Sequence, residues 1–233
     1  MTAIPFDAPP LDSLSAAIDG DLDSPGPVCL LAHGAGVPMD HALMADFAGR
    51  LARRGLTTVR FNYPYTERRA REGGRRPPDR MPRLLEAHAA ALAWLRSQAP
   101  GRAVILGGKS MGGRASSLLL AGEGTATDAD LAAVRGAFFW GYPLHPPKKP
   151  EQLRTEHWPR LQHPCLFLQG TRDPLCPLGT LERELPGLAA PYELHVVEGG
   201  DHSLEVLKRS GLDQDEVFDE VAERVWSWAQ SLP

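Results

Sequence analysis

Short apolar runs alternate along the chain with longer segments in which apolar residues recur every three or four positions. The first run, residues 28–32, is apolar throughout, as expected of a strand that is buried on both faces of a sheet. The segment 40–54 carries Leu43, Phe47 and Leu51 on one helical stripe, and Gly55 follows it. This alternation is typical of a parallel sheet covered by helices.

The same pattern predicts the remaining strands and helices. Strands are expected at 28–32, 56–62, 103–106, 134–140, 165–169 and 192–197, and helices at 40–54, 83–97, 112–121, 178–185 and 215–229. The strands and helices follow one another closely, and we find neither an internal repeat nor a linker between domains. We therefore expect a single α/β domain over residues 1–233, with a mostly parallel central sheet and helices on both faces.

Three segments do not show this periodicity. In residues 1–27 we predict an edge strand over 14–18, with surface turns rich in Asp, Pro and Gly around it. Residues 64–82 are rich in arginine and glycine, and residues 142–164 are rich in proline. Both are predicted to be loops that border a site. Because neither is long enough to fold separately, we expect no large cap domain.

Composition and charge limit the classes of partner. The chain has 233 residues, 42% of them hydrophobic, and a formal net charge of −4. This charge provides no general attraction to nucleic acid or to an anionic membrane surface. The three cysteines form no CxxC pair, which fits a reducing compartment. Residues 1–27 lack a signal-peptide pattern, and no apolar run is long enough to span a membrane. We expect a cytoplasmic protein.

A glycine-rich turn carries the strongest chemical signal. Residues 108–112 read GKSMG, which matches G-x-S-x-G, with a predicted strand directly before the turn and a predicted helix directly after it. This is the context of a nucleophile elbow, in which Ser110 would be the nucleophile at a helix N-terminus. The simpler alternative is a capping serine in an ordinary strand–helix turn. A phosphate-binding loop is excluded, because Ala103 stands where that motif needs its first glycine.

A base and an orienting carboxylate are found in the order that such a fold requires. Asp173 follows the strand predicted at 165–169, and His202 follows the strand predicted at 192–197. Considered separately, Asp173 is also explained as a turn residue before Pro174, and His202 as a surface loop residue. Their order after Ser110 favours a Ser–Asp–His set. Asp201 is adjacent to His202, but this adjacency does not aim its carboxylate at the imidazole.

The segment after the first predicted strand supplies candidate oxyanion donors. Residues 33–36 read HGAG and place flexible backbone beside the elbow. We expect one donor to be the N–H of Met111, directly after the nucleophile, and the other to be the N–H of Ala35. His33 is interpreted as a hydrogen-bonding structural residue, and Cys176 as a packing residue. No histidine shows a metal-binding pattern, so neither a metal nor a cofactor is predicted.

These motifs resemble the α/β-hydrolase superfamily, from about residue 28 to the end of the chain. The segments 108–114, 60–65 and 141–147 (GKSMGGR, RFNYPY and GYPLHPP) are similar to a compact subfamily related to dienelactone hydrolases. That subfamily includes the hydrolase-like subunit of a histone-acetyltransferase complex. The resemblance implies an α/β-hydrolase fold. Dienelactone hydrolases use a cysteine nucleophile, whereas this chain has Ser110, so their activity is not carried over.

The predicted function is cleavage of a carboxylic ester or thioester through an acyl-serine intermediate, and the sequence also leaves peptide cleavage open. The alternative is a hydrolase-like interaction module with little turnover. Without a cap domain we expect an open, shallow pocket for a small acyl substrate. This substrate is the only partner predicted, and the sequence predicts no oligomeric state. Residues 68–83 hold seven arginines against Glu72 and Asp79. This excess of positive charge either attracts anionic ligands or belongs to a solvated loop.

Overall fold

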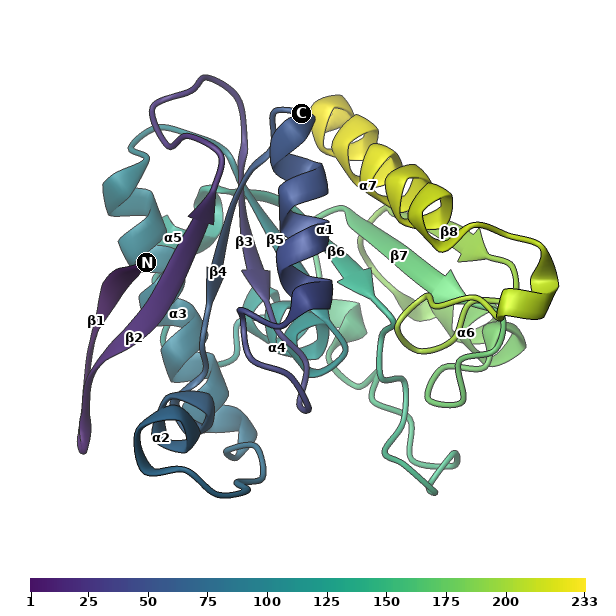
Figure 1. Cartoon of the computed structure of the whole chain (residues 1–233), viewed down its shortest axis with the longest axis horizontal. Helices are drawn as coiled ribbons and strands as arrows, with labels where there is room; N and C mark the ends of the chain where they lie inside the picture. Colours follow the sequence, from purple (N-terminus) through teal and green to yellow (C-terminus); the bar gives the residue numbers. More distant parts are fainter.

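An eight-stranded sheet forms the centre of the molecule. The computed structural model describes all 233 residues, and Figure 1 shows the sheet between helices. The strand order is β1-β2-β4-β3-β5-β6-β7-β8. The strands are β1 Thr2–Ala8, β2 Leu11–Asp19, β3 Val28–Ala32, β4 Thr57–Phe61, β5 Val104–Lys109, β6 Val134–Trp140, β7 Cys165–Gly170 and β8 Tyr192–Val197.

Strands β3 to β8 run parallel, and β1 and β2 add an antiparallel hairpin at one edge. In the parallel part, Leu30 of β3 pairs with Val59 of β4 on one side and with Leu106 of β5 on the other. β2 pairs antiparallel with both β1 and β4. All six strands predicted from the apolar runs are present, and the mostly parallel sheet is confirmed.

The interpretation of residues 1–27 needs correction. The strand predicted at 14–18 is the longer β2, and it lies inside the sheet, between β1 and β4. The edge strand is β1, which we had interpreted as surface turn. β1 alternates buried Ile4 and Phe6 with exposed neighbours. Its Pro5 is tolerated because an edge strand leaves one row of N–H groups outside the ladder.

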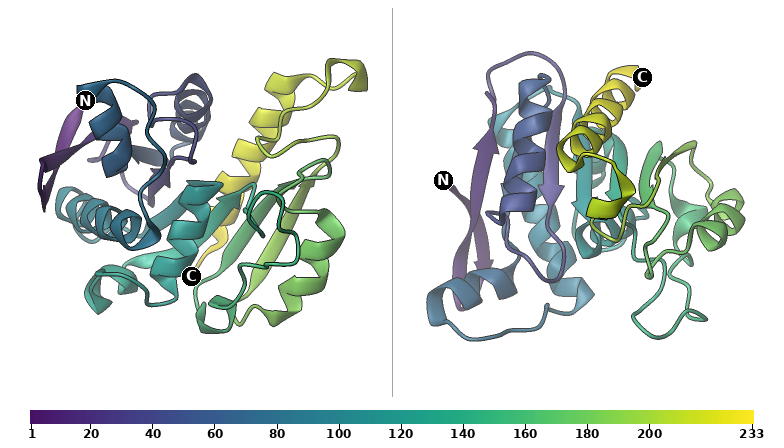
Figure 2. Two further views of the ribbon diagram at one scale, coloured as in Figure 1. Left: turned by 90° about the horizontal axis from the view of Figure 1, so that it is seen from below. Right: turned by 45° about the vertical axis from the view of Figure 1, so that its right-hand side comes forward.

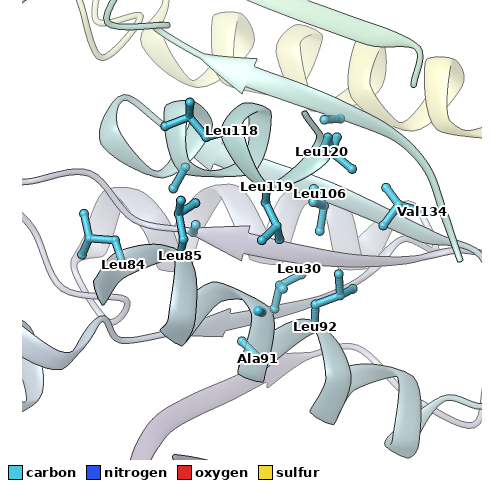
Figure 3. Packing of buried hydrophobic residues seen from close by; sticks show 14 of the residues in the cluster. Leu30, Leu84, Leu85, Ala91, Leu92, Leu106, Leu118, Leu119, Leu120 and Val134 are labelled. Atoms are coloured by element: carbon cyan, nitrogen blue, oxygen red, sulfur yellow. The ribbon is translucent and has the colours of Figure 1, made fainter. Parts of the chain in front are cut away.

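Helices cover both faces of the sheet (Figure 2). The helices are α1 Ala42–Arg53, α2 Pro64–Glu72, α3 Met81–Gln98, α4 Met111–Leu120, α5 Asp128–Ala132, α6 Leu178–Glu184 and α7 Gln214–Ser231. The apolar faces of α1 and α7 pack on one side of the sheet in a cluster of 20 buried residues. The other side, with α3, α4 and α6, holds a larger cluster of 42 buried residues. Figure 3 shows part of this larger core, where leucines of α3 and α4 meet Leu30 and Leu106 of the sheet.

Part of the predicted loop 64–82 is helical. Residues 64–72 form α2, with Pro64 in its first turn and Tyr65 and Glu67 buried. The Glu67 carboxylate accepts hydrogen bonds from the backbone N–H and the hydroxyl of Ser15 on β2. This contact between distant segments stabilises residues 64–72 as a helix, although their arginines and the glycines that follow suggest a loop. The short helix α5 was not predicted; it begins with a capping box between Thr127 and Asp130.

Residues 142–164 form a loop, as predicted. The loop contains one short 3₁₀ turn, Trp158–Arg160, and its aromatic residues fix it to the core. The Tyr142 hydroxyl and the His157 imidazole both lie within hydrogen-bonding distance of Ser117 on α4, at 3.2 and 2.8 Å. The chain has no large cap domain. None of the helices combines the length and the apolar character that a bilayer crossing requires.

We expect His88, in the core face of α3, to make stability depend on pH. Its imidazole is fully buried against the Tyr63 hydroxyl, and burial lowers its pKa to about 3. An unfolded histidine has a pKa of about 6.5. Between these values the unfolded chain binds a proton that the folded chain does not, so stability falls as the pH decreases. The contribution of His88 is about 1.4 kcal/mol per pH unit.

Denaturant unfolding of the wild type and of His88→Gln at several pH values between 4 and 7 measures this contribution. Glutamine is able to hydrogen-bond Tyr63 but does not titrate in this range. Below about pH 6, the slope of the unfolding free energy against pH should be smaller in His88→Gln by about 1.4 kcal/mol per unit, and the difference should disappear as the pH approaches 7. Equal slopes in the two proteins would contradict the assignment.

Candidate active site

Four parallel strands carry the predicted site residues to one edge of the sheet. Ser110 directly follows β5, Asp173 follows β7 and His202 follows β8. Ala35 lies in the loop after β3, which is the neighbour of β5. Because the carboxyl ends of parallel strands meet at the same edge, residues separated by more than 160 positions in sequence come together.

The turn around Ser110 has the strained geometry of a nucleophile elbow. Ser110 has φ 51° and ψ −115°, a conformation that L residues rarely adopt. The flanking glycines permit it by close backbone contacts. A Cβ on Gly108 would lie 2.2 Å from the Gly113 nitrogen, and one on Gly112 would lie 2.4 Å from the Ala32 carbonyl oxygen. Only glycine fits at these two positions, so the turn holds the Ser110 hydroxyl at the start of α4.

A continuous line of hydrogen bonds joins the three predicted side chains. The His202 Nε2 atom lies 2.8 Å from the Ser110 hydroxyl oxygen. The His202 Nδ1 atom lies 2.8 Å from the Asp173 Oδ2 atom. With Asp173 ionised, Nδ1–H donates to the carboxylate, which leaves the Nε2 lone pair free to accept from the serine hydroxyl. The arrangement is able to move a proton from the hydroxyl to the imidazole.

Asp173 is held as a carboxylate in a buried position. Its side chain is fully buried, which by itself raises its pKa. The hydrogen bond and charge of His202, the amide of Gln169 at 2.9 Å and the N–H of Leu175 at 2.8 Å outweigh burial, and the net pKa is lowered. The carboxylate is therefore ionised at neutral pH.

Two residues that support this line were missed by the sequence analysis. Gln169, at the end of β7, donates its side-chain amide to the Asp173 carboxylate. The sequence feature that could have indicated this role is a side-chain amide near the end of an otherwise apolar strand. Gly141, with φ 61°, lies directly under the histidine loop, and a Cβ there would be 2.4 Å from the His202 carbonyl oxygen. A side chain at this position would push the imidazole away from Ser110.

The two predicted oxyanion donors line the same cavity as Ser110. Neither Ala35 N–H nor Met111 N–H donates to an acceptor within the protein. Burial lowers the pKa of His33 to about 4, so its ring is neutral; it contacts Gly34 O at 2.8 Å through Nδ1 and accepts from Tyr63 N–H at 3.1 Å. These contacts hold residues 33–36 in place beside Ser110.

The other side chains near the turn have structural roles. The Asp201 carboxylate accepts hydrogen bonds from the N–H groups of Ser203 and Glu205, so it faces its own backbone. Cys176 is fully buried in the larger core. No group of three or more histidine, cysteine, aspartate or glutamate side chains lies close enough together to hold a metal ion.

A cavity of about 350 Å³ opens beside Ser110. Its walls come from the two segments that were predicted to border a site, with Met81 and Asp79 on one side and Pro143 and Arg154 on the other. The apolar part is completed by Leu84, Met111 and Leu175, and α4 contributes Arg114. The cavity is small and partly open, and its charged residues were not predicted.

Comparison with known proteins agrees with this architecture. A family model described as an alpha/beta hydrolase domain matches residues 25–230. The match covers the whole parallel part of the sheet and all four loops that build the site. The hairpin β1–β2 lies outside it.

Solved structures with the same fold share little sequence with the chain. A dienelactone hydrolase from Anabaena variabilis superposes with a TM-score of 0.74 at 19% identity, over 99% of this chain and 96% of that one. An α/β serine hydrolase without a lid, from Xanthomonas campestris, gives 0.67 at 20% identity, over 97% and 94%. Est1E from Butyrivibrio proteoclasticus, with ferulic acid bound, gives 0.71 at 15% identity, over 98% and 97%. At these identities the likeness concerns the fold.

Proposed function

The chain belongs to the alpha/beta hydrolase domain family, and from this premise we propose that it is a serine hydrolase that cleaves a carboxylic ester or thioester through an acyl-serine intermediate. The observation that carries the proposal is the unbroken hydrogen-bond line from Ser110 through His202 to Asp173, with 2.8 Å at each step. A free serine hydroxyl is almost fully protonated at neutral pH, so it needs such a base to become a nucleophile.

In the proposed acylation step, the Ser110 oxygen attacks the carbonyl carbon of the substrate while His202 Nε2 takes the hydroxyl proton. The carbonyl oxygen becomes an oxyanion, which accepts hydrogen bonds from the N–H groups of Ala35 and Met111. Losing one such donor typically slows a reaction of this kind by about 10²–10³-fold. The imidazolium then gives its proton to the leaving alcohol or thiol, and the C–O or C–S bond breaks to leave the acyl-serine.

Deacylation repeats these steps with water as the nucleophile. His202 accepts a proton from the water as the water oxygen attacks the acyl carbon. It then gives the proton to the Ser110 oxygen as the bond between that oxygen and the acyl carbon breaks, which releases the carboxylic acid. Asp173 remains a carboxylate throughout; it fixes the imidazole tautomer and stabilises the imidazolium. The partly open cavity gives water access to the acyl group.

Three observations support an ester substrate of modest size. The cavity of about 350 Å³ has room for a short acyl or aryl group. No cap domain closes over it. Several proteins with the same fold are described as esterases, among them a cold-adapted esterase from an Arctic intertidal metagenome and an esterase domain from Rhodothermus marinus.

We also propose that the chain is part of the compact subfamily related to dienelactone hydrolases. The turn 108–114 and the likeness to the Anabaena variabilis structure support this placement. Since the subfamily includes a hydrolase-like subunit of a histone-acetyltransferase complex, an interaction module without turnover is the alternative function. The hydrogen-bonded Ser110 and the two unoccupied N–H donors favour an enzyme.

Labelling with a fluorophosphonate probe tests the proposed function directly. Such a probe phosphonylates a serine only when a neighbouring base activates it. We expect mass spectrometry of the folded chain to find one modified residue, Ser110, and we expect heat-denatured protein to remain unlabelled. Hydrolysis of p-nitrophenyl acetate by the same sample should stop as labelling proceeds. An unlabelled native protein that hydrolyses no short-chain ester would instead favour the interaction module.

A further inference from the structure

Two arginines face the cavity that holds the Ser110 hydroxyl. Arg114 lies on α4, one helical turn after Ser110, and Arg154 lies in the loop between β6 and β7. Both line the cavity together with Ser110 and Met111, and both are half-buried. They come from segments 40 residues apart in the sequence, and folding brings both to the cavity beside Ser110.

Neither guanidinium has a partner in the protein. No carboxylate forms an ion pair with Arg114 or Arg154, and neither side chain donates a hydrogen bond, although the Arg114 Nε atom is buried. By contrast, the two buried arginines Arg50 and Arg60 are paired: Arg50 contacts three aspartates, and Arg60 contacts Asp19. Leaving a guanidinium partly desolvated without an acceptor is unfavourable, so the two side chains are arranged for an acceptor that arrives with a ligand.

The charge beside Arg154 is mostly positive. Burial, followed by the positive charge of Arg114, lowers the pKa of Arg154, and the negative charge of Glu156 offsets this only in part. The two guanidinium groups therefore repel each other. An anion bound between them would relieve this repulsion. The single acidic side chain that lines the cavity, Asp79, already pairs with Arg68, so it does not neutralise Arg114 or Arg154.

A second hollow extends the positive charge to the mouth of the site. This hollow of about 500 Å³ meets the first at Ala35, and three arginines, Arg69, Arg75 and Arg76, line it. Arg76 pairs with Glu72, whereas Arg69 and Arg75 have no carboxylate partner. An anion that approaches Ser110 from this side therefore moves through a region of positive potential, which raises its rate of encounter.

We propose that the substrate is an anionic ester or thioester, whose carboxylate or phosphate group is bound by Arg114 and Arg154 while its carbonyl lies against Ser110. This inference rests on the proposed function and names the substrate class of that same site. Guanidinium groups suit this task because their planar donors match the oxygens of carboxylate and phosphate. The anionic group lies a few bonds from the scissile carbonyl, as the short span of the cavity requires.

Two matched pairs of esters test the proposal on either side of the scissile bond. The acyl side is probed by p-nitrophenyl hemiglutarate against p-nitrophenyl valerate, and the alcohol side by 4-acetoxybenzoate against its methyl ester. The measured quantity is the ratio of kcat/KM for the anionic ester to kcat/KM for the neutral one. We expect Arg114→Gln and Arg154→Gln each to lower this ratio by about 10- to 100-fold in at least one pair.

Two further variants separate binding from folding and from net charge. Arg154→Lys keeps the charge without the planar fork, so it should recover part of the ratio that Arg154→Gln loses. Arg53→Gln removes one positive charge from an exposed position on α1. In this variant, kcat/KM for each ester and the ratio within each pair should equal the wild-type values. Melting temperatures of all variants show which of them are folded.

The outcomes distinguish this inference from the proposed function. If the wild type labels at Ser110 and hydrolyses the neutral esters, but the ratios do not respond to either arginine, anion recognition is wrong and the serine hydrolase remains. If the wild type neither labels nor hydrolyses any of the four esters, both proposals are wrong.

Discussion

Replacing Ser110 with alanine should lower kcat for ester hydrolysis by about 10⁶-fold, which is the size of effect seen when a nucleophilic serine of this kind is removed. The substitution deletes the oxygen that lies 2.8 Å from His202 Nε2, so no acyl-serine forms. Substrate binding at the arginines and the N–H donors remains, and a small rate above that of water alone is expected from them. Stopped assays with p-nitrophenyl acetate and fluorophosphonate labelling both measure the loss.

The stability of Ser110→Ala should be close to that of the wild type. The Ser110 side chain makes a single hydrogen bond, to a histidine that is 21% exposed and can turn to water. The positive φ of the turn is unfavourable for alanine and serine alike. A matched control is Ser203→Ala, one residue from His202, whose hydroxyl makes no hydrogen bond in the protein. Wild-type turnover in Ser110→Ala, or equal losses in the two variants, would rule out Ser110 as the nucleophile.

Asp173→Asn should lower kcat by about 10⁴-fold at neutral pH while the fold remains intact, as the corresponding change does in other Ser–His–Asp sites. The loss has two causes. The negative charge that stabilises the imidazolium disappears. The amide also offers one acceptor where the carboxylate offers two, although three donors surround it: His202 Nδ1–H, Gln169 Nε2 and Leu175 N–H.

Neither orientation of the new amide satisfies these donors. If its oxygen faces Leu175, its NH₂ group faces His202 and forces the proton onto Nε2, where it blocks proton transfer from Ser110. If its oxygen faces His202, its NH₂ group lies against the Leu175 N–H. In the first arrangement the new NH₂ group also lies against the Gln169 Nε2 donor, and in the second it lies against the Leu175 N–H. Each arrangement therefore places two donors in contact, so we expect a lower melting temperature as well as slower turnover.

Gln169→Leu provides the graded comparison for this prediction. It removes one donor to Asp173 but keeps the carboxylate and its contact with His202. The expected decrease in kcat is about 10-fold, the lower range for a hydrogen bond to a charged group. KM should change little, since Gln169 does not line the cavity. A loss in Asp173→Asn no larger than that in Gln169→Leu would mean that Asp173 acts only through packing.

The local sequence was enough to predict the regular elements that build the parallel part of the fold. The inner strands β3, β5, β6 and β7 are short, mostly apolar runs, because both of their faces are buried. The edge strand β8 is only partly buried and carries Glu193 and His195, but its valines and its place after α6 were enough to predict it. The larger helices show an apolar stripe because one of their faces packs on the sheet. The turn at Ser110 is equally local, since the glycines at 108 and 112 are needed by close contacts within the turn and with the neighbouring strand β3.

Apart from the five-residue helix α5, whose capping box is local, the elements that were missed are stabilised by distant contacts. β1 has an alternating pattern interrupted by Pro5, and it becomes a strand because β2 offers a ladder to it. Helix α2 is rich in arginine, and the contact of Glu67 with Ser15 fixes it against β2. In both cases the local preference is weak, and pairing with residues far along the chain decides the structure.

The sequence by itself determined the order of the strands β3 to β8 and of the larger helices, and the residue types that the chemistry requires: Ser110, Asp173 and His202, each after the carboxyl end of a strand. Their hydrogen-bonding distances were decided by the tertiary structure, because they depend on how β5, β7 and β8 are arranged and on the space that Gly141 leaves under the histidine loop. The same holds for Arg114 and Arg154. Each is an ordinary arginine in the sequence, and only folding places both in the cavity beside Ser110 with no carboxylate in an ion pair with either.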